Sequence, residues 1–171
     1  MSSARPEPKT PPSSGPFAIR VAVARLRREV RRWRLPIVTE IANRERPPAA
    51  AGRPSVCDVP FRVLISTLLS LRTKDATTAA ASERLFALAA TPEGVLRIPE
   101  KRLTRLIYPV GFYRTKARTL REVCRRLLAD FGGAVPRDLE ALLTLPGVGR
   151  KTANLVLTRG HGLPGICVDT H

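Results

Sequence analysis

The pattern that most constrains the fold is helical periodicity with no sign of strands. Beyond residue 58, apolar residues recur every three or four positions in one segment after another. No stretch alternates apolar and polar residues over the length of a strand. Proline or glycine interrupts most segments, so the helices are short. A longer helix is predicted over 113–131, ending at Gly132-Gly133, because glycine readily adopts the left-handed conformation that closes a helix. We therefore predict an all-α chain.

Residues that favour helix N-termini precede several of these segments. Side chains such as Asp and Thr accept hydrogen bonds from the first backbone amides, and proline is tolerated in the first turn. The expected helix starts are Asp58 with Pro60, Thr73, Thr91 with Pro92, and Pro99, followed by short helices over 137–143 and 150–159.

The N-terminal third has a different composition. Residues 1–17 are rich in Pro and Ser and are predicted to be a disordered lead-in. Residues 18–45 predict basic amphipathic helices, and residues 46–56 read as a linker. A basic amphipathic helix can lie on a membrane, act as an import presequence, or pack its apolar stripe on a domain while its arginines face DNA. The Pro-rich lead-in argues against the import reading.

The charge of the chain points to a polyanionic partner. Lys+Arg number 30 and Asp+Glu 14, a formal net charge of +16, and only five of the basic residues are lysines. A hydrophobic content of 43% is enough for a core and excludes disorder throughout. No apolar run approaches the ~20 residues of a membrane-spanning helix, and no secretory signal is recognisable. The spacing of Cys57, Cys124 and Cys167 matches no metal site, so reduced thiols in a cytoplasmic protein are expected.

The stretch Leu145–Ala153 joins two apolar helical segments through a glycine turn. Gly147 and Gly149 allow a sharp turn, and backbone amides at such a turn can bind a phosphate group. Lys151 follows in the first turn of the next helix, beside Arg150, where the helix dipole and the neighbouring cation disfavour an ammonium. Lys151 is therefore a candidate neutral amine nucleophile, with simple phosphate pairing as the equal alternative.

Four stretches, in order, resemble the endonuclease III family of DNA glycosylases. They are 68–75 (LLSLRTKD), 110–117 (VGFYRTKA), 145–157 (LPGVGRKTANLVL) and 167–171 (CVDTH). The resemblance implies the helix–hairpin–helix DNA glycosylase fold, with a six-helix barrel over 57–163 and the helix–hairpin–helix at 137–159. It also implies a second helical domain that is incomplete here, with 18–45 as its N-terminal part and 164–171 as the start of its other half.

The resemblance also implies a function in base excision repair. The family's activity is that of a glycosylase with abasic-site lyase activity, acting on oxidised pyrimidines and abasic sites in double-stranded DNA. Lys151 matches the nucleophile that forms a Schiff base, and Asp169 matches the essential carboxylate. The lysine favours this bifunctional activity over simple base hydrolysis. The alternative is a non-catalytic helix–hairpin–helix DNA-binding module. A monomer in a bacterial cytoplasm, not bound to membranes, is expected.

Other positions match residues of the family that contact DNA. Phe112 matches the wedge that enters the base stack, with a buried turn aromatic as the alternative, and Arg72 matches the residue that enters from the opposite strand, with a plain phosphate contact as the alternative. Ser70 and Asp75 lie where pocket residues are expected, although Asp75 could simply begin a helix. The remaining expected DNA contacts are the hairpin residues Gly147, Val148, Gly149, Arg150 and Thr152 and the basic rim residues Arg114 and Lys116.

The family often carries a 4Fe-4S cluster on four C-terminal cysteines. The chain ends at His171 without such cysteines, and Cys57, Cys124 and Cys167 cannot replace them. We therefore expect no cofactor and no metal in this chain. Because Asp169 would lack the helix that follows it in the family, we also expect weak DNA binding and low or absent lyase activity from these 171 residues.

Overall fold

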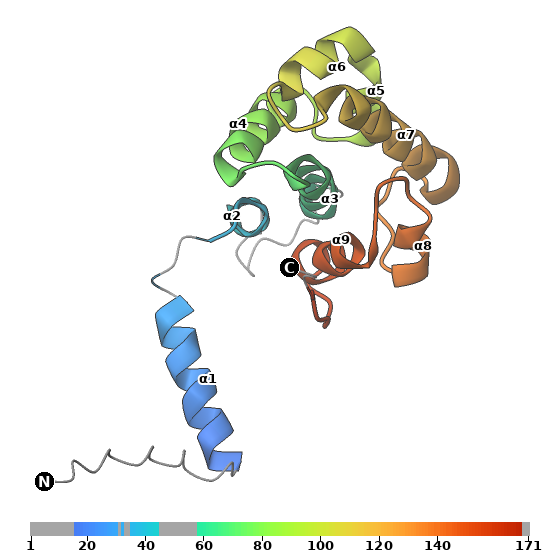
Figure 1. Ribbon diagram of the computed structural model, residues 1–171. Helices are drawn as coiled ribbons and strands as arrows, with labels where there is room; N and C mark the ends of the chain where they lie inside the picture. The colour runs from blue at the N-terminus through green and yellow to red at the C-terminus, as the bar shows by residue number, and fades with distance from the viewer. Residues whose placement is uncertain (1–15, 31, 33–34, 45–57, 169–171) are drawn as a thin grey trace, which may run out of the picture. The chain divides into compact units, whose positions relative to one another are not determined.

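The computed structural model describes residues 16–30, 32, 35–44 and 58–168 (Figure 1). All regular elements in these ranges are helices, which confirms the all-α prediction. The predictions for the lead-in up to residue 15, the linker 46–56, Cys57 and residues 169–171 lie outside the described residues. The chain divides into two compact units, residues 1–35 and 36–171.

The first unit contains helix α1 (Pro16–Val30), which begins two residues before its expected start. Arg32, just after the helix, approaches Glu29 at 3.7 Å. The large apolar side chains of α1 are exposed to solvent: Ile19, Val21, Val23, Leu26 and Val30. This helix is therefore amphipathic, as predicted, but its apolar stripe is not part of a core.

Helix α2 (Ile37–Arg44) belongs to the second unit. It packs against α3, α4 and η1, and it buries Ile37, Val38 and Ala42. The sequence grouped residues 18–45 into one N-terminal part, whereas the structure separates α1 from α2 at Pro36. The apolar face of α2 accounts for the difference, because it is covered by the helices of the second unit.

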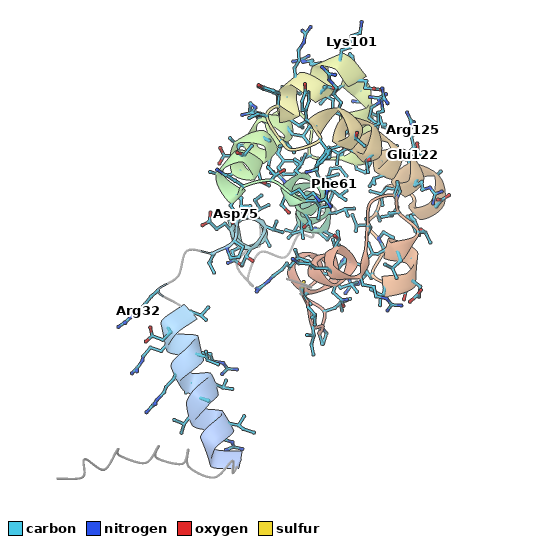
Figure 2. All side chains as sticks on the ribbon, in the orientation of Figure 1. Arg32, Phe61, Asp75, Lys101, Glu122 and Arg125 are labelled. Atoms are coloured by element: carbon cyan, nitrogen blue, oxygen red, sulfur yellow. The ribbon has the colours of Figure 1, made fainter. Side chains whose placement is uncertain are left out.

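Helix α3 (Asp58–Ser70) lies at the centre of the second unit and contacts α2, α4, α7, α9 and η1. Because neighbours surround it, side chains all around the helix are buried, including Phe61, Leu64 and Leu69 (Figure 2). Even this helix is short, and none of the described helices is long and apolar enough to cross a membrane.

Three helices follow α3 in the chain: α4 (Asp75–Phe86), α5 (Pro92–Arg97) and α6 (Glu100–Ile107). Thr91 caps α5 as predicted, since its hydroxyl accepts a hydrogen bond from the Gly94 amide at 3.2 Å. The prediction that Thr73 caps α4 is wrong. Lys74 occupies the N-cap, and the Thr73 hydroxyl is engaged elsewhere.

Helix α7 (Tyr113–Phe131) has the predicted bounds and ends at Gly132, whose φ of 59° is the left-handed conformation expected there. Its basic side chains reach the C-terminal ends of other helices. Arg121 donates to the carbonyls of Leu96, in the last turn of α5, and of Ile98, just after it. Arg126 donates to the carbonyl of Thr144, just after α8. Carbonyl groups at a helix C-terminus have no partner within the helix, so these interhelical caps satisfy them.

The second unit closes with α8 (Leu139–Leu143), α9 (Arg150–Leu155) and a π-helical turn, η1 (Val156–Gly160). The sequence predicted a regular helix over 150–159, but the His161 amide donates to the Val156 carbonyl five residues earlier, at 3.0 Å. This wider turn lies against the start of α3. A Cβ on Gly160 would lie 2.9 Å from the Cα of Pro60, so glycine permits the close approach.

Candidate DNA-repair site

The hairpin between α8 and α9 is held by buried apolar residues at its base. Leu145 and Val148 are buried, and Gly147 adopts a φ of 78°. A Cβ on Gly147 would lie 3.2 Å from the methyl carbon of Thr119 on α7 and would be strained by this φ. Glycine is therefore needed here both for the backbone conformation and for packing against α7.

The outer side of the hairpin is open. A Cβ placed on Gly149 would meet no atom within 4 Å, and Gly149 is the N-cap of α9 without a side-chain capping bond. Arg150 is exposed beside it. The side chains of Val148 and Thr152 are buried, so of the five hairpin residues expected to contact DNA these two could do so only through their backbone amides.

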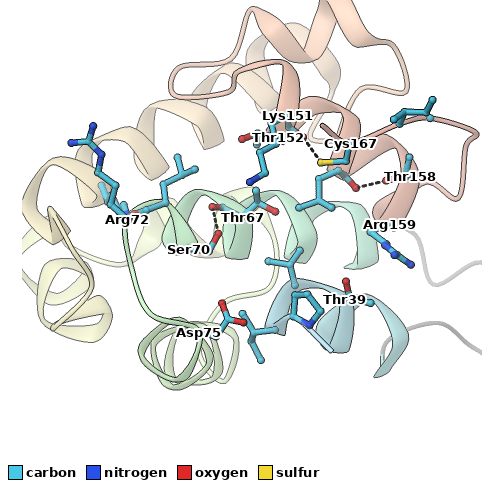
Figure 3. A pocket seen from close by; sticks show the side chains of 18 of the residues that line it. Thr39, Thr67, Ser70, Arg72, Asp75, Lys151, Thr152, Thr158, Arg159 and Cys167 are labelled. Carbon is cyan, nitrogen blue, oxygen red and sulfur yellow. Dashed lines mark hydrogen bonds between the residues drawn. The ribbon is translucent and has the colours of Figure 1, made fainter. Parts of the chain in front are cut away.

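Lys151 projects from the first turn of α9 into a pocket of about 1200 Å³ (Figure 3). The pocket lies between α2, the end of α3, the start of α4, the start of α7, α9 with η1, and the segment 165–167. Two of the residues that line it, Leu155 and Thr158, follow Lys151 by four and seven positions. This helical spacing is a signal in the sequence that could have identified them as pocket residues.

Ser70 and Asp75, the two residues expected in a substrate pocket, line the same pocket as Lys151. Ser70 ends α3, and its hydroxyl donates to the Thr67 carbonyl at 2.8 Å. Asp75 is the first residue of α4, with an exposed side chain on the pocket wall (Figure 3). The structure thus places Asp75 both at a helix start and on the pocket, so the two readings of this residue are compatible.

Arg72 and Phe112 also border the pocket, and they touch each other. The Arg72 guanidinium carbon lies 5.9 Å from the centre of the Phe112 ring. Phe112 is 63% exposed, which overturns the alternative of a buried turn aromatic. Both residues have a positive φ, 52° and 57°, and they are the two non-glycine residues with this conformation in the described part of the chain.

Lys116 lies differently from the basic rim position that was expected. Its ammonium donates to the carbonyls of Leu69 and Leu71, at 2.7 and 2.5 Å, and to the hydroxyl of Thr73 at 3.2 Å. Burial lowers the pKa of Lys116 to about 8. The side chain therefore caps the C-terminus of α3 and borders the pocket, with its three donors directed at the protein itself.

Arg114 is exposed, two residues after Phe112, and its guanidinium carbon lies 5.7 Å from the centre of the Tyr113 ring. Tyr113 in turn packs edge-to-face on Tyr108, with ring centres 5.3 Å apart. Of the other basic residues expected to contact DNA, Arg72 and Arg150 share this exposure. Asp169, the expected catalytic carboxylate, lies outside the described residues.

The pocket contains residues that the sequence did not single out. Thr39 of α2 and Arg159 of η1 line it, as does Cys167, whose thiol donates to the Lys151 carbonyl at 3.5 Å (Figure 3). Thr39 could not have been expected, because α2 was assigned to a different part of the molecule. Cys167 belongs to the motif 167–171 (CVDTH), in which the sequence predicts a role for Asp169 alone.

The described residues do not fit an iron–sulfur cluster. No three His, Cys, Asp or Glu side chains among them converge to hold a metal ion. Cys124 is buried in the core, where burial raises the pKa of its thiol to about 12 and disfavours the thiolate that a metal needs. Cys167 is exposed in the pocket, far along the chain from any other described cysteine.

These features define a class of protein: an all-helical domain in which a helix–hairpin–helix brings a lysine to a pocket. The chain belongs to the HhH-GPD superfamily of base excision DNA repair proteins, whose family profile matches residues 65–171. This finding and the relatives below confirm the resemblance to endonuclease III drawn from the four motifs.

Two curated relatives and one solved structure illustrate the similarity. Endonuclease III of Thermotoga maritima (strain ATCC 43589 / DSM 3109 / JCM 10099 / NBRC 100826 / MSB8) is 51% identical over 112 residues, which are 66% of this chain and 53% of the relative. Endonuclease III of Escherichia coli (strain K12) is 43% identical over 112 residues, with the same two coverages. The chain thus spans about half the length of these relatives.

The solved structure is described as "Structure of a Trapped Endonuclease III-DNA Covalent Intermediate: Estranged-Adenine Complex". It superimposes with a TM-score of 0.63 and 36% sequence identity, covering 84% of this chain and 64% of that chain.

Proposed function

We propose that the protein is a DNA glycosylase with abasic-site lyase activity, and that Lys151 is its nucleophile. The observation that carries the proposal is the position of Lys151, which enters the pocket from the first turn after the hairpin (Figure 3). Membership of the HhH-GPD superfamily and the similarity to endonuclease III support the same activity. We propose damaged pyrimidines and abasic sites in duplex DNA as substrates, on that similarity.

The chemistry requires one amine at the sugar. The Lys151 Nζ attacks C1′ of the damaged nucleotide, the glycosidic bond breaks, and its electron pair leaves with the base, which takes up a proton. Opening of the sugar ring then gives a Schiff base between C1′ and Nζ. Removal of a proton from C2′ allows the C3′–O bond to break, and the phosphate departs with that electron pair.

The pocket walls favour such a reaction. A nucleotide must leave the base stack before its C1′ can be attacked, and the pocket provides a space for it beside Lys151. Asp75 places a carboxylate on the opposite wall, where it can stabilise positive charge on the sugar or accept a hydrogen bond from the base (Figure 3). Asp169 is proposed to act as the essential carboxylate, on the resemblance of its motif.

The hairpin serves binding. The open side at Gly149, with Arg150 exposed beside it, suits the phosphate backbone of DNA, which backbone amides and arginine contact without reading sequence. Phe112 and Arg72 are proposed to fill the gap left by the extruded nucleotide. Phe112 is suited to this because an exposed aromatic ring can stack on bases.

Borohydride trapping on a duplex with one abasic site tests the nucleophile. Borohydride reduces the Schiff base to a stable adduct that accumulates, so slow turnover is sufficient for detection. The wild-type chain and Lys101→Ala, a change at an exposed lysine on α6, are expected to form the adduct slowly, in keeping with the low activity expected of these 171 residues, and Lys151→Ala is expected to form none (Figure 2). Strong trapping by the wild type would contradict the expectation of low activity. No adduct from the wild type, with salt-sensitive DNA binding retained, would instead support the non-catalytic module.

A further inference from the structure

The two residues proposed to enter the DNA stack come from segments far apart in the sequence, yet they are held as a pair. Arg72 lies in the loop after α3 and Phe112 in the turn before α7. Their side chains meet, with the guanidinium carbon 5.9 Å from the ring centre. Both backbones are left-handed, a conformation that residues with a Cβ keep only when their surroundings enforce it.

The hydroxyl of Thr73 connects the two segments. It accepts a hydrogen bond from the Gly111 amide at 3.1 Å and another from the Lys116 ammonium at 3.2 Å, and it donates to the Leu71 carbonyl at 3.3 Å. One oxygen thus joins the loop that carries Arg72 to the turn that carries Phe112.

The backbones are also in direct contact beside this hydroxyl. A Cβ on Gly111 would lie 2.6 Å from the carbonyl oxygen of Arg72, so only glycine allows the turn to approach the loop this closely. Lys116 completes the connection, because its ammonium also donates to the carbonyls of Leu69 and Leu71. These contacts join the end of α3 and the loop that carries Arg72 to the turn that carries Phe112 and the first turns of α7.

We propose that Thr73 and Lys116 are positioning residues that hold Arg72 and Phe112 as one preformed wedge for opening the duplex. This inference rests on the proposed function, and it adds the residues that make the wedge rigid. A rigid wedge lowers the cost of ordering these side chains when DNA is bound. Thr73 is therefore required for the reaction on duplex DNA, in which the nucleotide must first leave the base stack. It is dispensable for the reaction on single-stranded DNA, in which the nucleotide is already unstacked.

The test compares duplex and single-stranded DNA. The variant is Thr73→Val, which keeps the shape of the side chain and removes the hydroxyl, and Thr73→Ser is its conservative partner. Unstacking is measured as the fluorescence increase of 2-aminopurine placed beside an abasic site in a duplex, which requires binding but no catalysis. Borohydride trapping is measured on the same duplex and on the single strand alone.

Thr73→Val is expected to lose most of the fluorescence increase and to trap the duplex more slowly by roughly tenfold or more, because small displacements of positioning groups have large effects. Trapping on the single strand should be unchanged, and Thr73→Ser should restore the duplex reaction. Lys116→Met is expected to lose the fluorescence increase as Thr73→Val does. The matched control is Arg121→Met, which removes another interhelical cap of α7 that contacts neither wedge segment.

Several results would overturn the inference. One is an equal loss on duplex and single strand for Thr73→Val, and another is a loss for Arg121→Met as large as for Thr73→Val, since either would mean general destabilisation. A wild-type chain that binds the duplex without any fluorescence increase would also overturn it. Absence of trapping by the wild type on both substrates would instead count against the proposed lyase, while the fluorescence comparison would still decide whether Thr73 positions the wedge.

Discussion

At the scale of single residues, the backbone at Phe112 opposes the stability of the fold. A left-handed conformation costs a residue with a Cβ ~1–2 kcal/mol, and the exposed ring recovers little of this by burial. Residues in such conformations gather at functional sites, where the surrounding contacts enforce them. We therefore attribute the conformation of Phe112 to the function of its side chain and not to a contribution to the stability of the fold.

A pair of substitutions measures this cost. Phe112→Gly and Phe112→Ala both remove the ring, but only glycine relieves the positive φ. We expect Phe112→Gly to be the more stable by about 0.5 kcal/mol, because the relief of ~1–2 kcal/mol exceeds the ~0.5–1 kcal/mol that glycine loses through its freedom in the unfolded chain. Urea unfolding provides the measurement.

Arg105, exposed on the regular helix α6, supplies the control. There the order should reverse, with Arg105→Gly less stable than Arg105→Ala by about 1 kcal/mol. If Phe112→Gly were less stable than Phe112→Ala by the same margin as at Arg105, the backbone at this turn would carry no strain.

Thr73 shows the limit of what single residues reveal in a sequence. A threonine before a helical segment predicts an N-cap, and Thr91 fulfils that prediction. Thr73 does not, because its hydroxyl bonds to Gly111 and Lys116, which lie far away in the chain. The same distance concealed the role of Lys116. By contrast, Gly147 and Lys151 could be predicted, since the hairpin that positions them is local.

At the scale of elements, the bounds of α7 could be predicted because its apolar residues keep one period and glycines end it. What the pattern could not show is that α7 organises its neighbours. Its side chains Lys116, Arg121 and Arg126 cap the C-terminal ends of α3, α5 and α8. Composition alone would assign these arginines to a solvated surface or to phosphate contacts, whereas Arg121 and Arg126 stabilise the fold by capping helices.

The caps on α5 and α8 can be removed separately. Arg121→Met and Arg126→Met keep most of the apolar stem and lose the donors, and each is expected to lower the free energy of unfolding by about 1–2 kcal/mol. The two arginines have no common partner, so the double variant should show the sum within about 0.5 kcal/mol.

Urea unfolding of the wild type and three variants forms the cycle. Arg118→Met is a suitable reference, because this arginine of α7 forms only an exposed contact with Glu100 at 3.3 Å, and it should change stability by less than about 1 kcal/mol. Effects of Arg121→Met and Arg126→Met no larger than this reference would contradict the capping role.

At the scale of the whole molecule, the N-terminal part that is rich in positive charge is not the part that contains the buried core. Residues 1–35 hold nine basic and two acidic residues, whereas every buried apolar side chain in the described part of the chain lies between Ile37 and Leu157. The first unit therefore contributes charge without contributing to this core. The two compact units could not be located from composition, which grouped α1 with α2.

Deletion of residues 1–35 tests this division. We expect the unfolding midpoint of the second unit to stay within a few degrees of the full chain, because its core is retained. Affinity for undamaged duplex should fall, and the dependence of log affinity on log salt should become less steep by about 0.9 for each phosphate that the deleted residues had neutralised. A large fall in the midpoint would show that α1 stabilises the second unit.

The caps supplied by α7 have a further consequence for how the second unit opens. Because the ends of three helices are bound by side chains of a single helix, partial unfolding of α7 would leave the terminal carbonyls of α3, α5 and α8 without partners at the same time. Local opening at one of these ends is then coupled to the others. Amide hydrogens at the three helix ends should accordingly exchange with solvent in one cooperative event rather than fraying independently.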